Sequence, residues 1–212
     1  MLKKHLAALA VILTLPATAL AGQIGGLADH MGGQLLTATV SVGVIDRDVK
    51  RSGTDDDYKM NVLSARVTYG LNDRVDLYAT LGKANIDSFG NVDDSLEDIY
   101  GGGVKFLLFE GANKTRVILN ADANFMETSD ADYRDISGSV IISRKRGNLT
   151  PYGGVKVSAV EINPDLGKDW EEEKGTGFFA GLDYFVNPNV YFTGEIHVFA
   201  ENTIFAGVGY NF

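Results

Sequence analysis

A repeated alternation of apolar with small or polar residues is the sequence feature that most limits how this chain can fold. Between Leu36 and Ile45, Leu, Ala and Val occupy every second position, and Thr, Ser and Gly lie between them. Successive side chains of a strand point to opposite faces, so a period of two predicts a strand with one apolar and one polar face. The pattern recurs along the chain, helical periodicity is weak, and the sequence therefore predicts an all-β protein.

The alternation predicts about ten strands, joined by connections that alternate in length. The short connections lie at 72–73, 110–113, 145–148 and 187–189, and the longer ones at 47–57, 87–97, 127–134 and 162–174, with a last short one near 201–202. Short turns at one end and long loops at the other are typical of an up-and-down antiparallel barrel. The predicted strands are 35–46, 58–71, 75–86, 98–109, 114–126, 135–144, 149–161, 175–185, 190–200 and 203–212.

The first 21 residues have the pattern of a secretory signal peptide. Lys3 and Lys4 precede an apolar stretch of about ten residues, and Ala19-Leu20-Ala21 has the form of a cleavage site. We therefore expect residues 1–21 to be removed, residues 22–34 to form an N-terminal periplasmic segment, and residues 35–212 to form the barrel.

Charge and cysteine content exclude several classes of protein. The chain has 28 acidic and 19 basic residues, and such an acidic balance disfavours nucleic-acid binding. It has no cysteine, which excludes a disulfide framework and a thiol nucleophile. Twenty of the 28 acids fall in the four long connections and their immediate flanks, so the end of the barrel with the long loops is predicted to be acidic.

The C-terminal segment Val208-Gly209-Tyr210-Asn211-Phe212 carries a family resemblance. A last strand with alternating apolar residues and a terminal Phe resembles the insertion signal of small Gram-negative outer-membrane β-barrel proteins of the OmpA, OmpX and OmpW type. The resemblance implies a transmembrane barrel in a bacterial outer membrane, with Tyr210 and Phe212 recognised by the barrel-assembly machinery. Many such relatives have eight strands, so eight is the alternative to ten. A soluble periplasmic barrel with its apolar face turned inward is a further alternative.

The polar face of the predicted strands carries equal numbers of acidic and basic residues. Charges in a barrel interior must pair, because an isolated buried charge is costly. We therefore predict an interior charge network that largely fills the lumen; a narrow pore for small solutes is the alternative. The residues of this network are Arg66, Asp76, Lys105, Arg116, Asp122, Lys156, Asp183 and Glu195.

These features favour a non-enzymatic surface or structural barrel over a catalyst. Glu195 and His197 share one strand face and form the only candidate for general-base chemistry, which leaves a barrel hydrolase as a third hypothesis. No cofactor or resident metal site is predicted. Outer-membrane lipid and lipopolysaccharide are the expected partners, and the acidic clusters at 55–57, 93–94 and 171–173 suggest divalent cations at the external loops.

Overall fold

The computed structural model describes residues 33, 35–51, 54–86, 96–127, 131–164, 170–171, 175–199 and 201–212. Eleven strands occur in this part of the chain. Their bounds are β1 Leu36–Arg51, β2 Thr54–Gly70, β3 Val75–Ile86, β4 Glu97–Glu110, β5 Thr115–Glu127, β6 Ala131–Arg144, β7 Leu149–Pro164, β8 Trp170–Glu171, β9 Gly175–Phe185, β10 Val190–Val198 and β11 Asn202–Asn211.

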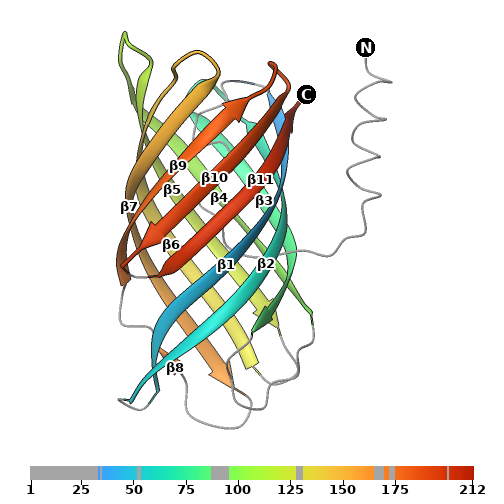
Figure 1. Ribbon diagram of the computed structural model, residues 1–212, viewed down its shortest axis with the longest axis vertical. Coiled ribbons are helices and arrows are strands. Elements are labelled where there is room, and N and C mark those ends of the chain that lie inside the picture. The colour runs from blue at the N-terminus through green and yellow to red at the C-terminus, as the bar shows by residue number, and fades with distance from the viewer. Residues whose placement is uncertain are drawn as a thin grey trace.

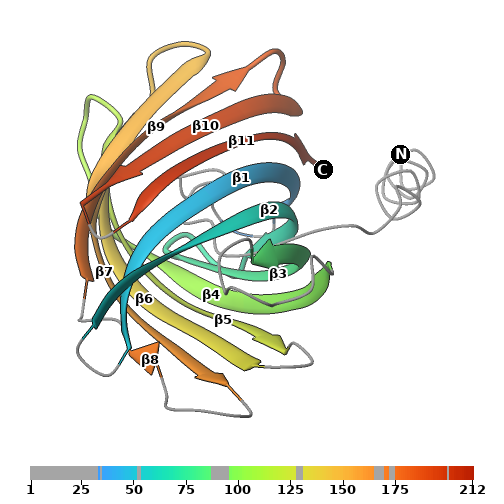
Figure 2. The ribbon, with the colours of Figure 1, turned by 60° about the horizontal axis from the view of Figure 1, so that its bottom comes forward.

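Ten of these strands close into an antiparallel barrel. Each of the ten pairs with its neighbour in chain order, β7 pairs directly with β9, and β11 pairs with β1 from Thr37↔Asn211 to Asp46↔Asn202. Figure 1 shows the tilted strands, with the C-terminus and the short turns at the upper end. The view towards the long-loop end in Figure 2 shows β11 lying beside β1, where the ring closes. The prediction of a ten-stranded all-β barrel is confirmed.

The strands extend further towards the long-loop end than the alternation predicted. The predicted link at 47–57 was wrong, since β1 and β2 stay paired as far as Arg51↔Thr54. Likewise, β6 begins at Ala131 instead of 135. Residues beyond position 46 are polar at nearly every place, so the period-two signal stops while backbone pairing continues.

The two-residue strand β8 was not predicted. It pairs with β1 at Lys50↔Glu171 and with β7 at Glu161↔Glu171. It thereby bridges the long-loop ends of two strands that are not neighbours in the barrel wall, as the lower part of Figure 1 shows. A segment this short carries no periodicity from which it could be recognised.

The outer wall of the barrel is apolar. Leu81 is 66% exposed and Ile204 65% exposed, and they belong to a large set of outward Val, Leu, Ile and Phe side chains. An exposed apolar wall of this extent is typical of a barrel surrounded by lipid, and it disfavours the soluble alternative. Among the residues that the structure describes, no helix is long and apolar enough to cross a membrane.

Inward aromatic rings lie over inward glycines of the adjacent strand. In the sheet register Phe205 faces Gly43, Tyr152 faces Gly181, and Phe179 faces Gly154. A Cβ at Gly43 would lie 2.1 Å from Cδ1 of Phe205, so the ring occupies the space that a side chain would need. Tyr78 over Gly103 and Tyr191 over Gly209 repeat the arrangement. The interior glycines therefore make room for aromatic rings.

Candidate functional site in the barrel interior

Seven of the eight predicted interior charges are buried on the inner face of the barrel. They are at most 8% exposed: Arg66, Asp76, Lys105, Asp122, Lys156, Asp183 and Glu195. Arg116 lies apart from them near the short-turn end, with Nη2 3.1 Å from Oε1 of Glu110 and a side chain that is 23% exposed. The structure therefore brings seven of the residues into the interior and leaves Arg116 at the rim.

Three further charged residues complete the interior: Arg47, Asp135 and Glu201, each at most 4% exposed. Glu201 is the centre of this group. Its carboxylate accepts hydrogen bonds from Arg47 Nη2 and, at 3.0 Å, from Lys156 Nζ. Arg47 Nη1 also lies 3.8 Å from Oδ2 of Asp135. We call Arg47, Asp135, Lys156, Glu195, His197 and Glu201 the Glu201 hub.

His197 occupies the hub between two carboxylates. Its Nδ1 lies 2.5 Å from Oε1 of Glu201, and its Nε2 lies 2.7 Å from Oε1 of Glu195. The ring centroid is 5.6 Å from that of Phe179 and 6.0 Å from that of Phe205. Both ring nitrogens are thus engaged by carboxylates, and aromatic rings flank the imidazole.

A second polar chain crosses the interior through Tyr78. The Arg66 guanidinium lies 4.3 Å from the centre of the Tyr78 ring, and the Tyr78 hydroxyl donates to Oδ1 of Asn120 at 2.8 Å. Asn120 Nδ2 donates in turn to Asp122 at 2.9 Å, and Ser137 Oγ donates to the same carboxylate oxygen at 3.0 Å. This series of polar contacts links strands β2, β3, β5 and β6 on the inner face of the barrel.

Lys105 lies between the two networks. Asp76, Asp183 and Glu195 attract its ammonium group and Arg66 repels it, with the ammonium 5.9 Å from the Tyr78 ring. Lys105 is 1% exposed, and Asp76 and Asp183 are fully buried. The ammonium group of Lys105 is therefore enclosed by charged side chains of both networks.

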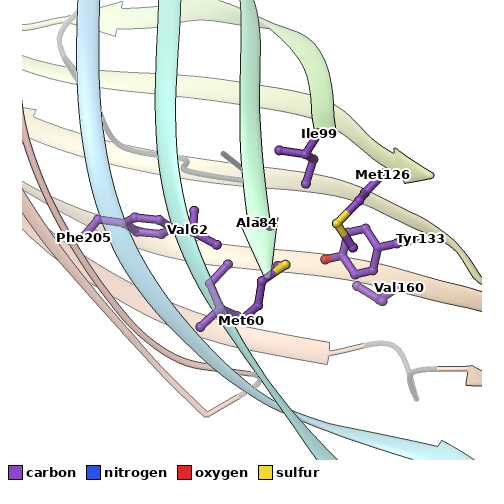
Figure 3. Close-up of a cluster of buried hydrophobic side chains, with 9 residues drawn as sticks. Met60, Val62, Ala84, Ile99, Met126, Tyr133, Val160 and Phe205 are labelled. Atoms are coloured by element: carbon purple, nitrogen blue, oxygen red, sulfur yellow. The ribbon is translucent and has the colours of Figure 1, made fainter. Parts of the chain in front are cut away.

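The interior also holds two clusters of buried apolar side chains, which the sequence analysis did not predict. An outer cluster lies near the long-loop end, where Figure 3 shows its side chains converging from several strands. It comprises Ile45, Met60, Val62, Ala84, Ile99, Met126, Tyr133, Val160 and Phe205. A second cluster, whose members on β4–β7 lie towards the short turns, comprises Leu107, Ile118, Ile141, Tyr152 and Phe179. The interior charges therefore share the lumen with two apolar clusters.

The C-terminal residues close the barrel at its short-turn end. The Phe212 backbone N–H donates to the Leu36 carbonyl at 2.9 Å, and the ring of Phe212 lies edge-on to that of Tyr210 at 4.9 Å. This geometry is compatible with a terminal signal, and the role of both residues in insertion stays a prediction.

The predicted loop sites lie mostly outside what the structure can describe. The side chains of the acidic clusters at 55–57, 93–94 and 171–173 are not among the described side chains, and neither are residues 1–32. Within the described part of the chain, no three His, Asp or Glu side chains are placed to hold a metal ion.

Comparison with known proteins tests the fold. No protein-family model matches the chain, and no curated protein matches it. An outer-membrane channel from Pseudomonas putida F1 is similar in structure, with a TM-score of 0.59 at 10% identity over 90% of this chain and 100% of that one. The fold is that of an outer-membrane β-barrel.

Two further solved structures are more distant. The translocator domain of the autotransporter NalP from Neisseria meningitidis gives a TM-score of 0.45 at 12% identity, over 87% of this chain and 90% of that one. Neisserial surface protein A gives 0.40 at 16% identity, over 85% and 98%. The shared fold with the Pseudomonas putida channel and the apolar outer wall together place this chain in a bacterial outer membrane.

Proposed function

We propose that this protein is a non-enzymatic, non-conducting outer-membrane barrel that acts through its acidic external loops. One observation carries the proposal: the charged side chains in the middle of the interior are at most 8% exposed. An aqueous pore would leave its lining side chains accessible to water. A barrel of ten strands is also close to the size at which side chains fill the interior.

The environment of His197 supports a non-enzymatic role. A general base must reach the proton that it removes, directly or through one water molecule. His197 is 3% exposed, and both of its ring nitrogens contact carboxylates, Glu195 and Glu201. The Glu195–His197 pair therefore suits an interior ion network better than a hydrolase.

A narrow channel is the second candidate, since the similar Pseudomonas putida protein is named as a channel. Conductance across a planar bilayer separates the two. We expect the refolded protein to give no unitary steps, after a heat-dependent gel shift has shown that it is folded and a large porin has shown that the assay works.

A matched variant tests whether the lumen is the reason for the absence of current. The double change Phe179→Ala and Phe205→Ala removes the two rings that flank His197, and we expect it to conduct. Stable steps from the unmodified protein that change with Lys105→Glu would contradict the proposal and favour the narrow channel. A folded protein that remains soluble and inserts into no bilayer would contradict the membrane assignment as well.

A further inference from the structure

A groove of about 460 Å³ lies on the lipid-facing wall over β4, β5, β6 and β7. Its floor is formed by two small outward residues, Ala121 and Gly138, which face each other in the sheet register. Larger apolar side chains rise around them and make the surface concave: Phe106, Leu119, Val140 and Val157. Its lining is almost wholly apolar, which suits a hydrocarbon chain.

A cluster of cations lies at the short-turn end of the same strands. The turns that follow β4 and β6 are adjacent, because the Lys145 backbone N–H donates to the Lys114 carbonyl. Arg144 precedes Lys145 on the outward side of β6, and Arg146 follows it. We call Lys114, Arg144, Lys145 and Arg146 the basic turn cluster; all four side chains are exposed.

The cations of this cluster are available to an external anion. Arg116, the next base along β5, is already paired with Glu110. In the described part of the chain, no carboxylate pairs with Lys114, Arg144 or Arg146. Exposed cations that lie together at a membrane interface attract anionic headgroups.

The spacing between groove and cluster matches a lipid. Gly138 and Arg144 are six residues apart on β6, which is about 20 Å along a strand. At a strand tilt of about 40° this corresponds to about 15 Å along the membrane normal, or half of a hydrocarbon core of about 30 Å. An acyl chain whose headgroup lies at the cluster therefore ends at the depth of the groove.

We propose that this wall binds an anionic phospholipid of the periplasmic leaflet, with its phosphate at the basic turn cluster and an acyl chain in the groove over Ala121 and Gly138. Charge complementarity selects the anionic headgroup, and the concave apolar wall holds the chain. The site lies on the outside of the barrel, so it is independent of whether the lumen conducts.

Electron spin resonance of lipids labelled near the end of the acyl chain tests the proposal. The refolded protein is placed in phosphatidylcholine vesicles with a trace of spin-labelled phosphatidylglycerol or phosphatidylcholine. We expect motional restriction of the phosphatidylglycerol label with a preference of about five-fold at low salt, and a loss of that preference at high salt.

Two variants separate the headgroup from the chain. Replacing all four cations of the basic turn cluster by Gln should reduce the preference to about one-fold, whereas Arg74→Gln at another short turn should leave it unchanged. Gly138→Ile should fill the groove and reduce the restricted fraction. A Cβ at Gly138 meets only Asn120 O at 3.8 Å, so the change fits the backbone.

Gly194→Ile is the matched control for the groove. Its Cβ meets only Phe205 O at 3.9 Å, so it adds the same bulk to the wall at β10. Equal restriction of both labels, or equal effects of the two glycine variants, would overturn the proposal. So would a dimer, detected by cross-linking, that Gly138→Ile converts to a monomer without changing lipid preference, because the groove would then hold a second copy of the chain.

Discussion

Glu201 links three strands of the barrel through its side chain, although the sequence analysis did not single it out. It lies just before β11 and contacts Arg47 of β1, Lys156 of β7 and His197 of β10. Strands that are distant in the chain are thus joined by one carboxylate. Removing it would leave two buried cations without this counterion.

Glu201→Ala should therefore destabilise the barrel strongly. Breaking a buried ion pair from one side typically costs about 3–5 kcal/mol, because the remaining charge stays buried. The measurement is the free energy of unfolding in urea of the protein refolded into vesicles. Lys83→Ala is the control, since Lys83 pairs with Asp98, which is 81% exposed, and should cost about 1 kcal/mol or less. Equal losses in the two variants would show that the hub adds no stability.

The hub also marks the limit of what the sequence could predict about the site. Seven interior charges were found because they alternate with apolar neighbours inside recognisable strands. Arg47 and Glu201 lie one or two residues beyond the predicted strand ends at 46 and 203. Both keep the odd-numbered parity of their strands' inward residues, so extending that parity would have found them. Which charges pair depends on how the barrel closes, and a local sequence pattern cannot predict this pairing.

At the scale of elements, the positions of inward glycines are explained by the aromatic rings of the strands with which they pair. Gly43, Gly154 and Gly181 are crowded mainly by aromatic side chains of the paired strand. The sequence of a single strand shows the alternation, whereas the aromatic partner of each glycine is known only once the register between strands is known.

Gly43→Ala should destabilise the β1–β11 pair. The added Cβ would lie 2.1 Å from the Phe205 ring, and overpacking of a filled interior costs about 1–3 kcal/mol. Urea unfolding measures the effect, with the outward Gly194→Ala expected to change stability by less than about 0.5 kcal/mol. Adding Phe205→Leu to Gly43→Ala should recover part of the loss in a double-mutant cycle. Additive effects would contradict a direct contact.

The strand count and order could be predicted because an outer-membrane barrel exposes one face to lipid along its whole membrane span. The ends of β1 and β2 towards the long loops could not, because residues on both faces are polar there and backbone pairing alone continues the strands. The apolar clusters inside the barrel were missed for another reason. Inward Met60, Ile99 and Ile118 interrupt the alternation of polarity, although they keep the alternation of direction.

At the scale of the whole molecule, the barrel wall is continuous through the natural ends of strands β1 and β11. The Phe212 N–H reaches the Leu36 carbonyl, and ten residue pairs join the two strands. We therefore expect that the barrel can close with the chain ends placed elsewhere in the wall.

A circular permutant of residues 35–212 tests this expectation. Phe212 is joined to Leu35 by a short linker, and new ends are opened between Asn72 and Asp73 in an exposed turn. We expect the permutant to refold in detergent with the same heat-dependent gel shift. In cells its assembly should fall, because Tyr210 and Phe212 are no longer terminal. Normal assembly in cells would contradict their role as an insertion signal, and failure to refold would show that strand order matters for closure.

The glycine–aromatic pairs also disfavour incorrect registers between neighbouring strands. A shift of one residue between neighbouring strands turns the outward apolar side chains inward, but a shift of two leaves the two faces intact, so polarity alone cannot reject it. Between β7 and β9, Tyr152 faces Gly181 and Gly154 faces Phe179. A shift of two residues one way sets Tyr152 against Phe179, and the other way sets the two glycines against each other. Either shift would therefore bring two large rings together or leave a void between two glycines, although the polarity of both faces would be unchanged.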